Sequence, residues 1–370
     1  MEYSIKPKRF GRKENNPLPS KEDNWIIRDF MFYIRADANN IIATGHIMRC
    51  LSIADALKQN GIDTTFITAD NNASELIQTR GYKMFCLDSK WNDMITEIAK
   101  LERYIVDNEI ERILVDSYYA TDEYLSQLTS VTEVIYLDDL GIIKYPVNKL
   151  INYNIYAKDV VEYNLLSAKG TQCYLGTEYA PLREEFRNIK PEFRIDVNNI
   201  LITTGGTDSY KIALKLVELI TKTPKLKQCE YNIISGMFNI SRIKLREYER
   251  LYDNIHVYEN VRNMSELMLK CDIAISASGS TMYELCACAV PVISFSMADN
   301  QVPIVDGFAK AGVAIACGDA RDGVNELAER IVDEVIFLMN NVSIREKMSD
   351  KARQVVDGIG ALRIAQCIEM

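Results

Sequence analysis

The sequence predicts an α/β protein built from two tandem Rossmann-like units with a cleft between them. Short apolar stretches alternate with amphipathic ones along most of the chain, which is the pattern of a parallel sheet covered by helices on both faces. The alternation stops in the polar segment "APLREEFRNIKPEFRID" (180–196), which contains two prolines, and then begins again. With 370 residues, of which 48% are hydrophobic, the chain is long enough to bury the cores of two domains.

The first unit follows an N-terminal extension, residues 1–30. Apolar stretches such as "FMFYIRAD" (30–37) are each followed by a segment with helical periodicity, so the strands are expected to pair in parallel. The predicted strands are 30–37, 63–70, 112–119 and 131–139, and the predicted helices are 46–59, 72–79, 93–108 and 121–128.

The second unit repeats the same alternation. We expect an N-terminal Rossmann-like domain over 31–190, a C-terminal Rossmann-like domain over 191–370 and a hinge near 187–197. The carboxyl ends of both sheets would then face the cleft, where open α/β sheets bind their ligands. The predicted strands are 199–206, 231–236, 254–260, 272–278 and 290–296, and the predicted helices are 209–222, 241–251, 263–270 and 281–289.

Composition excludes several classes of protein. The net charge of −9 argues against a nucleic-acid partner, because phosphate-backbone binding normally needs a basic excess. The nine cysteines are an odd number without a CxxC pair, which favours free thiols in a reducing cytoplasm. No stretch has the roughly 18 to 20 apolar residues that a transmembrane helix needs. We therefore expect a soluble cytoplasmic protein, and no cluster has the spacing of a metal site.

The N-terminal extension has two interpretations. Its Lys, Arg, Asn and Pro residues offer little to bury, which is typical of a solvated tail. Alternatively it is a weak docking arm for an anionic membrane or a partner, since basic residues surround Phe10. These residues are Lys6, Lys8, Arg9, Arg12 and Lys13.

His46 is one of only two histidines, and it lies where the loop 38–45 enters a predicted helix. That loop leaves the first strand at the carboxyl edge of the sheet, and Gly45 permits close approach of the backbone to a ligand. The positive end of the helix dipole disfavours an imidazolium, so a neutral, proton-accepting ring is expected. The alternative is a histidine that only bonds its own loop. His256, inside the strand "NIHVYEN", is interpreted as structural.

Two turns in the second unit follow strands and precede helices. "LITTGGTDSYK" contains Gly205, Gly206 and Thr207, and "ISASGSTMYEL" contains Ser278, Gly279, Ser280 and Thr281. Backbone N–H groups in such turns can face an anion, and two turns at corresponding strand ends point to a diphosphate. Glu284 either accepts hydrogen bonds from a ribose or closes a capping box with Thr281.

Several motifs, in the same order along residues 31 to about 345, resemble one family. They include "RADANNIIATGHIMRC" (35–50), "VDSYY" (115–119), "TTGGTDSYK" (203–211), "ISASGSTMYEL" (275–285) and "MADNQ" (297–301). The chain resembles the UDP-sugar hydrolases of pseudaminic acid synthesis and their spore-coat polysaccharide relatives. That family has a GT-B architecture akin to the lipid II N-acetylglucosaminyl transferase.

The resemblance implies roles for individual residues. His46 becomes the catalytic base in the N-terminal domain and Tyr118 a neighbouring active-site residue. The C-terminal domain becomes the UDP-binding domain, with the turns 205–208 and 278–281 on the diphosphate and Glu284 on the ribose. We expect no cofactor and no required metal. The remaining residues expected to contact the substrate are Arg35, Asp37, Gly45, Arg49, Asp208, Val261, Asn300 and Gln301.

The roles of Ala43 and of the pair Asn300 and Gln301 stay open. The family's histidine loop commonly has a glycine where this chain has Ala43, and alanine costs roughly 1 kcal/mol or more if the residue needs a positive φ. The resemblance puts Asn300 and Gln301 beside the sugar, whereas their position near Val302 also suits a helix cap.

The reaction implied is hydrolysis of a UDP-linked amino sugar by water that His46 deprotonates, with inversion at the anomeric carbon. The expected substrate is UDP-2,4-diacetamido-2,4,6-trideoxy-β-L-altropyranose. The alternatives are a GT-B glycosyltransferase, in which an alcohol acceptor replaces water, and a nucleotide-sugar binder without catalytic activity.

Overall fold

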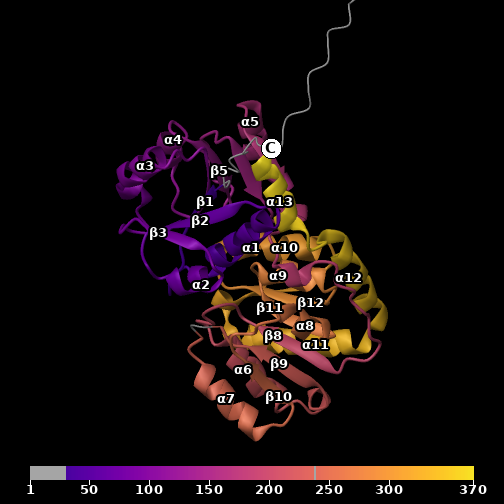
Figure 1. Cartoon of the computed structure of the whole chain (residues 1–370). Helices are drawn as coiled ribbons and strands as arrows, with labels where there is room; N and C mark the ends of the chain where they lie inside the picture. The colour runs from indigo at the N-terminus through magenta and orange to yellow at the C-terminus, as the bar shows by residue number, and fades with distance from the viewer. Residues whose placement is uncertain (1–30, 237–238) are drawn as a thin grey trace, which may run out of the picture.

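The computed structural model describes residues 31–236 and 239–370, and it contains two parallel sheets, each with helices packed around it (Figure 1). The basic segment interpreted as a tail or docking arm lies outside the described residues. Two α/β units in tandem confirm the predicted fold class.

The first sheet has seven strands in the order β3-β2-β1-β4-β5-β6-β7. β1 lies at the change of strand order, between β2 and β4, so the loop after β1 opens at the edge where ligands bind in such sheets. The strands are β1 Met31–Ala36, β2 Asp63–Thr68, β3 Lys83–Cys86, β4 Arg112–Asp116, β5 Glu133–Leu137, β6 Lys149–Asn152 and β7 Gln172–Leu175; the helices are α1 Gly45–Gln59, α2 Ser74–Thr79, α3 Ile98–Asp107, α4 Asp122–Leu128 and α5 Val161–Ala168.

The second sheet has six strands in the order β10-β9-β8-β11-β12-β13. Here β8 and β11 lie side by side at the change of order, and the two predicted anion-binding turns follow these strands. The strands are β8 Asn199–Thr203, β9 Glu230–Ile234, β10 Ile255–Tyr258, β11 Ile273–Ala277, β12 Val292–Ser296 and β13 Ala314–Asp319; the helices are α6 Ile212–Ile220, α7 Arg242–Leu251, α8 Met264–Leu269, α9 Thr281–Ala287, α10 Val302–Lys310, α11 Val324–Asn340, α12 Val342–Val355 and α13 Gly360–Glu369.

The chain passes between the two units twice. After α12 it returns to the first unit, where α13 packs along α1 (Figure 1), so the last helix of the predicted C-terminal domain is anchored on the N-terminal one. The two crossings touch, since a β-carbon at Gly360 would lie 2.2 Å from the carbonyl oxygen of Ala180. Only glycine permits this approach. This contact holds the second crossing, at Gly360, against the start of the first crossing, at Ala180.

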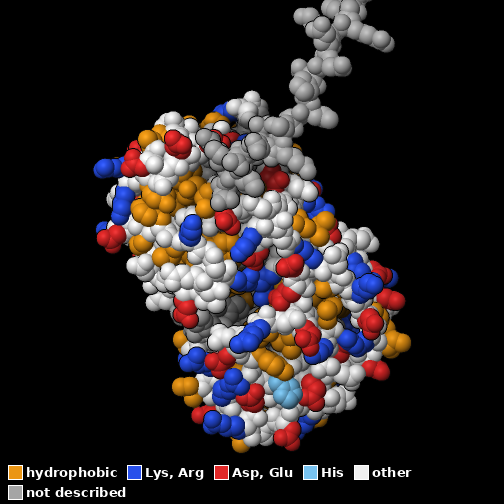
Figure 2. All heavy atoms as spheres, in the orientation of Figure 1, with side chains coloured by type: hydrophobic (Ala, Val, Ile, Leu, Met, Phe, Trp, Pro, Cys, Tyr) orange, Lys and Arg blue, Asp and Glu red, His pale blue; other side chains and the backbone are white. Residues whose placement is uncertain are grey.

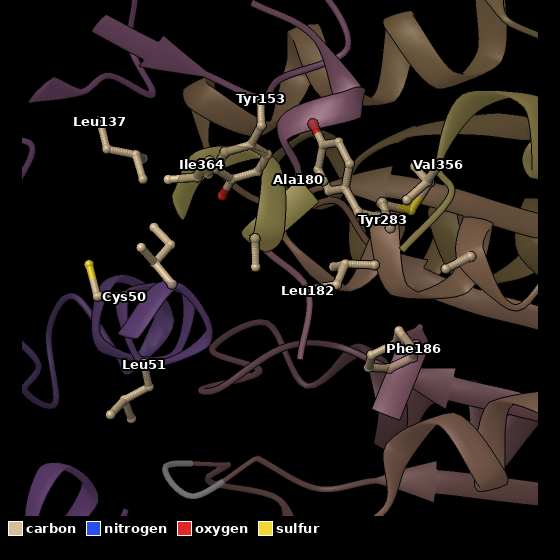
Figure 3. Packing of buried hydrophobic residues seen from close by; sticks show 14 of the residues in the cluster. Cys50, Leu51, Leu137, Tyr153, Ala180, Leu182, Phe186, Tyr283, Val356 and Ile364 are labelled. Carbon is tan, nitrogen blue, oxygen red and sulfur yellow. The ribbon is translucent and has the colours of Figure 1, made fainter. Parts of the chain in front are cut away.

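One hydrophobic core spans both units. It joins residues of α1 and β1 to residues of α9, α10 and α13, with Leu182 and Phe186 of the first crossing between them (Figure 3). Two further cores lie within the second and the first unit. The shared core holds the facing sheet edges in a defined geometry.

The surface, the cysteines and the helix lengths bear on the expectations from composition. Figure 2 shows positive and negative side chains interspersed over the visible face. All nine cysteines are free. In the part of the chain that the structure describes, no helix is both long and apolar enough to cross a membrane.

Candidate active site

A cleft between the two units has a volume of about 530 Å³. This volume lies in the range of small-molecule sites, and side chains and turns from both sheet edges line it. Most residues predicted to contact the substrate line this one cavity. They are Gly45, His46, Arg49, Tyr118, Gly205, Gly206, Val261, Ser278, Gly279, Ser280, Thr281, Glu284, Asn300 and Gln301.

His46 is oriented by a buried carboxylate. His46 lies in the first turn of α1 and is only 3% exposed. Its Nδ1 is 2.6 Å from Oδ1 of Asp116. Asp116 ends β4 directly beside Ala36 at the end of β1, so the sheet register brings the acid under the histidine loop. An acid on Nδ1 selects the tautomer in which Nε2 carries the lone pair, as in histidine-based hydrolases. The pair is therefore suited to general-base chemistry.

The charge of Asp116 is held by its neighbours. Burial opposes ionisation, but the Arg49 guanidinium and the His46 ring outweigh it and hold the pKa of Asp116 well below its ordinary range. Arg49 donates from Nε to Oδ2 of Asp116 at 2.6 Å and from Nη2 to Oδ1 at 2.5 Å. This bidentate pair fixes the plane of the carboxylate. Asp116 is therefore a permanent anion that orients the histidine.

Arg49 continues the network away from His46. Its Nη1 donates to the Tyr153 hydroxyl at 2.8 Å and also to Asp139, which follows β5. Arg49 was predicted to contact the substrate, and it lines the cleft, but protein acceptors occupy all three of its nitrogens. Its main contacts are therefore with the residues that orient the histidine.

Tyr118 lies against the base. Its ring contacts the His46 ring edge to face, with centroids 4.4 Å apart, and its hydroxyl is 3.4 Å from Oδ2 of Asp139. Burial raises the pKa of Tyr118, and the nearby Asp139 carboxylate adds to this rise. The side chain is thus a neutral hydroxyl that can donate a hydrogen bond at the cleft wall.

The two predicted anion-binding turns present unpaired backbone donors. The N–H groups of Gly205, Gly206, Gly279 and Ser280 have no acceptor within the described residues. All four residues line the cleft. Free N–H groups on converging turns are suited to an anion such as a diphosphate.

Glu284 does not form the capping box that was one interpretation of its position. No side chain caps α9, and Oε1 of Glu284 instead accepts a hydrogen bond of 2.9 Å from Nη2 of Arg183. Burial raises the pKa of Glu284, while Arg183 opposes this rise. The carboxylate lines the cleft with Arg183, which belongs to the first crossing between the units.

Asn300 and Gln301 precede α10 without capping it by a side-chain bond. Oε1 of Gln301 accepts from the N–H of Met297 at 2.8 Å, which shapes the loop after β12. Both residues line the cleft on the same side as Glu284. The Gln301 amide nitrogen stays available to another acceptor, because the loop uses only the oxygen.

Four residues predicted to contact the substrate do not line the cleft. Arg35 is fully buried in β1, where it pairs with Glu97 at 2.7 Å and with Asp37 at 2.6 Å. Asp208 is also fully buried, and its carboxylate accepts from the N–H groups of Ile212 and Ala213 at the start of α6. These polar residues satisfy internal partners instead of a ligand. The four residues are Arg35, Asp37, Thr207 and Asp208.

Ala43 has a φ of +56°, a left-handed conformation that glycine adopts more readily than alanine. The cost of roughly 1 kcal/mol expected for alanine therefore applies here. A β-carbon at Gly206 would lie 3.3 Å from the Ala43 methyl, so this loop approaches the opposite turn across the cleft.

His256 is on the surface, where Nε2 is 2.8 Å from Glu230, away from His46. In residues 31–236 and 239–370, no group of three His, Cys, Asp or Glu side chains is arranged to hold a metal ion. Asp138 and Asp139 have other partners: Asp138 accepts from the N–H groups of Leu140 and Gly141, and Asp139 binds Arg49.

Sequence reasoning missed the residues that support the base. Asp116 lies inside the motif "VDSYY", and its signal was an acid at the carboxyl end of an apolar strand. Asp139, Tyr153 and Asn154 gave weaker signals because their roles depend on the order of the strands. Arg183 gave no signal, since it is one of many charged residues in the segment 180–196.

Two named proteins resemble most of this chain in sequence. The chain is 24% identical over 351 residues to the spore coat polysaccharide biosynthesis protein SpsG of Bacillus subtilis, covering 91% of this chain and 97% of that protein. It is 26% identical over 283 residues to the UDP-2,4-diacetamido-2,4,6-trideoxy-beta-L-altropyranose hydrolase of Campylobacter jejuni, covering 76% of this chain and 97% of the relative. No protein-family model matches.

Among solved structures, MurG of Acinetobacter baumannii aligns with a TM-score of 0.60 at 15% identity, over 92% of this chain and 99% of the other. At this identity the likeness shows the fold alone. The chain thus has the GT-B fold, and its predicted resemblance to the diacetamido-sugar hydrolase and the spore-coat polysaccharide proteins is confirmed.

Proposed function

We propose that this protein hydrolyses a UDP-linked diacetamido-trideoxy sugar, releasing UDP and the free sugar for nonulosonic acid or surface-polysaccharide synthesis. The observation that carries the proposal is the Asp116–His46 pair. It lies in the same cleft as two turns whose N–H groups find no acceptor among residues 31–236 and 239–370. A base on one side and an anion site on the other suit displacement of a diphosphate. The named hydrolase relative supports the choice of substrate.

The base acts on water. Nε2 of His46 takes a proton while the water oxygen bonds to the anomeric carbon. The bond from that carbon to the diphosphate oxygen breaks, and its electron pair leaves with UDP. Because attack comes from the side opposite the leaving group, the product has inverted configuration. A positioned general base contributes about 10²- to 10⁴-fold to the rate.

The second unit holds the leaving group and the sugar. The N–H groups of Gly205, Gly206, Gly279 and Ser280 would stabilise charge growing on the diphosphate. Glu284 accepts hydrogen bonds from the ribose hydroxyls. Amide side chains recognise a neutral acetamido sugar without adding charge, and Asn300 and Gln301 supply them.

A glycosyltransferase reaction is the second candidate, because the solved structures of the same fold include glycosyltransferases. The same base could deprotonate an alcohol instead of water. An acceptor-dependent enzyme would keep its UDP-sugar intact until the acceptor is added. A nucleotide-sugar binder would release no UDP under either condition.

The test is release of UDP from a panel of UDP-sugars without an acceptor. We expect release from the diacetamido-trideoxy sugar and a loss of at least about a hundredfold in His46→Ala, with UDP affinity nearly unchanged. His256→Ala is the matched control, because it removes the other histidine, on the surface. Normal turnover in His46→Ala would remove this residue from the mechanism.

A further inference from the structure

A continuous series of hydrogen bonds links the helix behind the anion-binding turn to the catalytic base in the other unit. It runs from Tyr283 through Asn154, Asp139, Arg49 and Asp116 to His46. We propose that Tyr283 and Asn154 are positioning residues that couple nucleotide binding on α9 to the orientation of His46. This inference rests on the proposed function, and one arm of its test is independent of turnover.

The first link crosses between the units. Tyr283 precedes Glu284 on α9, is 1% exposed, and donates from its hydroxyl to Oδ1 of Asn154 at 3.1 Å. The same hydroxyl accepts from the N–H of Ile155 at 3.3 Å. Burial raises the pKa of Tyr283 well above its ordinary value, so the hydroxyl stays protonated and able to donate.

The ring of Tyr283 is fixed independently of its hydroxyl. It packs edge to face against Tyr153 and Phe308, with centroids 5.2 Å apart in both pairs. Figure 3 shows Tyr153 and Tyr283 side by side, on elements of the two units. Removing the hydroxyl should therefore cut the link without emptying the core.

The next links lie within the first unit. Nδ2 of Asn154 is 3.3 Å from both Oδ1 and the backbone oxygen of Asp139. The other oxygen of Asp139 binds Arg49, which holds both oxygens of Asp116. Asn154 is 2% exposed, so water cannot readily replace its bonds. A shift of Asn154 would therefore pass to the base through three charged groups: Asp139, Arg49 and Asp116.

Nucleotide binding acts at the start of this series. A diphosphate on the turn 278–281 and a ribose on Glu284 would fix α9, and with it Tyr283, in one position. Asn154 and Asp139 would then hold Arg49, and the Asp116–His46 pair would be ordered while the substrate is bound. The structure thus predicts that these residues affect turnover more than UDP affinity.

Two substitutions cut the series at different links. Tyr283→Phe removes the first donor and keeps the ring. Asn154→Asp keeps a carboxylate oxygen that accepts from Tyr283, but it replaces the Nδ2 donor that faces Asp139 with a second oxygen. This breaks the second link and adds charge repulsion between the two carboxylates. Tyr231→Phe is the matched control, because that buried hydroxyl bonds the carbonyl of Leu226 within the second unit.

We expect Tyr283→Phe to lower kcat on the order of tenfold, as loss of one buried hydrogen bond to a side chain allows, and Asn154→Asp to lower it at least as much. KM and the UDP dissociation constant should each change less than twofold in Tyr283→Phe and in Asn154→Asp. Tyr231→Phe should keep kcat while its Tm falls about as far as that of Tyr283→Phe. Unchanged kcat in Tyr283→Phe, or an equal loss in Tyr231→Phe, would overturn the positioning role.

The second arm observes His46 directly. With only two histidines in the chain, ¹⁵N-histidine labelling gives one ring signal set for His46 and an internal reference from surface-exposed His256. Saturating UDP should shift the His46 signals in the wild type and markedly less in Tyr283→Phe. Equal shifts, or none in the wild type, would overturn the coupling. Absence of hydrolysis with the shifts as expected would instead count against the proposed function.

Discussion

At the scale of single residues, the account depends on the charge and position of Asp116. Its carboxylate has four neighbours at once: the ring of His46, two nitrogens of Arg49 and the thiol of Cys50. Because the carboxylate stays ionised over the ordinary pH range, it remains a hydrogen-bond acceptor for Nδ1 of His46. Catalysis should therefore be sensitive to a change that keeps the size of Asp116 but removes its charge.

Asp116→Asn is expected to lower turnover by a factor on the order of 10³ to 10⁴, because an amide can present N–H to Nδ1 and select the wrong tautomer. UDP affinity should stay nearly the same, since the diphosphate turns belong to the other unit. Steady-state kinetics beside calorimetric UDP titration would measure both. Asp107→Asn, an exposed acid on α3, is the control. A loss below tenfold would mean that Asp116 does not orient the base.

Glu284→Gln is expected to weaken UDP binding by about 1 to 3 kcal/mol, because charge-assisted hydrogen bonds to the ribose become neutral ones. Calorimetric titration with UDP measures this change, and a melting curve reports the separate effect of losing the Arg183 ion pair. If Glu284 only holds Arg183, Tm falls and UDP affinity stays constant.

Single residues also show what the sequence could reveal. His46 was predictable because its loop, its helix and its rarity are all local features of the sequence. Its partner Asp116 is 70 residues away and meets it only through the pairing of β1 with β4. Arg35 and Asp37, in the same motif as His46, do not line the cleft, because both are buried and paired with internal partners that the local sequence does not reveal.

At the scale of elements, the turns between strands and helices carry the chemistry, and their shape depends on buried contacts behind them. Asp208 is one such contact, since it caps α6 directly after the turn of Gly205 and Gly206. Burial raises the pKa of Asp208 to about 6, although two backbone N–H groups oppose the rise.

This shift predicts a pH effect on stability. An unfolded aspartate has a pKa of about 4, so between about pH 4 and 6 the folded chain binds more protons than the unfolded one. The free energy of unfolding should therefore fall as pH rises through this window. Asp208→Asn has no carboxyl group to titrate at this position. The free energy of unfolding of the variant minus that of the wild type should therefore rise by roughly 2 to 3 kcal/mol from pH 4 to 7. Denaturant curves at several pH values would show it, and a constant difference would contradict the shift.

The turn of Gly205 and Gly206 also depends on Gly236, at the end of the next strand. A β-carbon there would lie 2.4 Å from the carbonyl oxygen of Gly205 and 2.5 Å from that of Gly206. Gly236→Ala must therefore displace the turn, and we expect UDP affinity to fall about tenfold or more, since several N–H donors would move together. Titration with UDP measures the loss, and circular dichroism verifies the fold. Unchanged affinity would place the diphosphate elsewhere.

Elements were predictable where they were long or strongly periodic. The strands and helices beside the histidine loop and the two anion-binding turns appear near their predicted places, but β3, β6, β7 and β13 were not predicted. The predicted helix 209–222 begins later, at Ile212, because Lys211 takes a left-handed conformation and Asp208 caps the helix.

At the scale of the whole molecule, two units are held so that a base on one faces an anion site on the other. The shared core, the paired crossings and the packing of α13 on α1 set this arrangement. The sequence predicted two units and a cleft from the repeated alternation. It did not predict the return of α13, because helix periodicity reveals a buried face and not the element that covers it.

The central claim is that water activated by His46 attacks the anomeric carbon. It is tested most directly by letting the protein act on the UDP-linked diacetamido-trideoxy sugar in ¹⁸O-enriched water without an acceptor, and locating the label by mass spectrometry. We expect ¹⁸O in the free sugar, none in UDP, and almost no turnover in His46→Ala. Label in the phosphate of the nucleotide product, or no release of UDP from the wild type, would contradict the account.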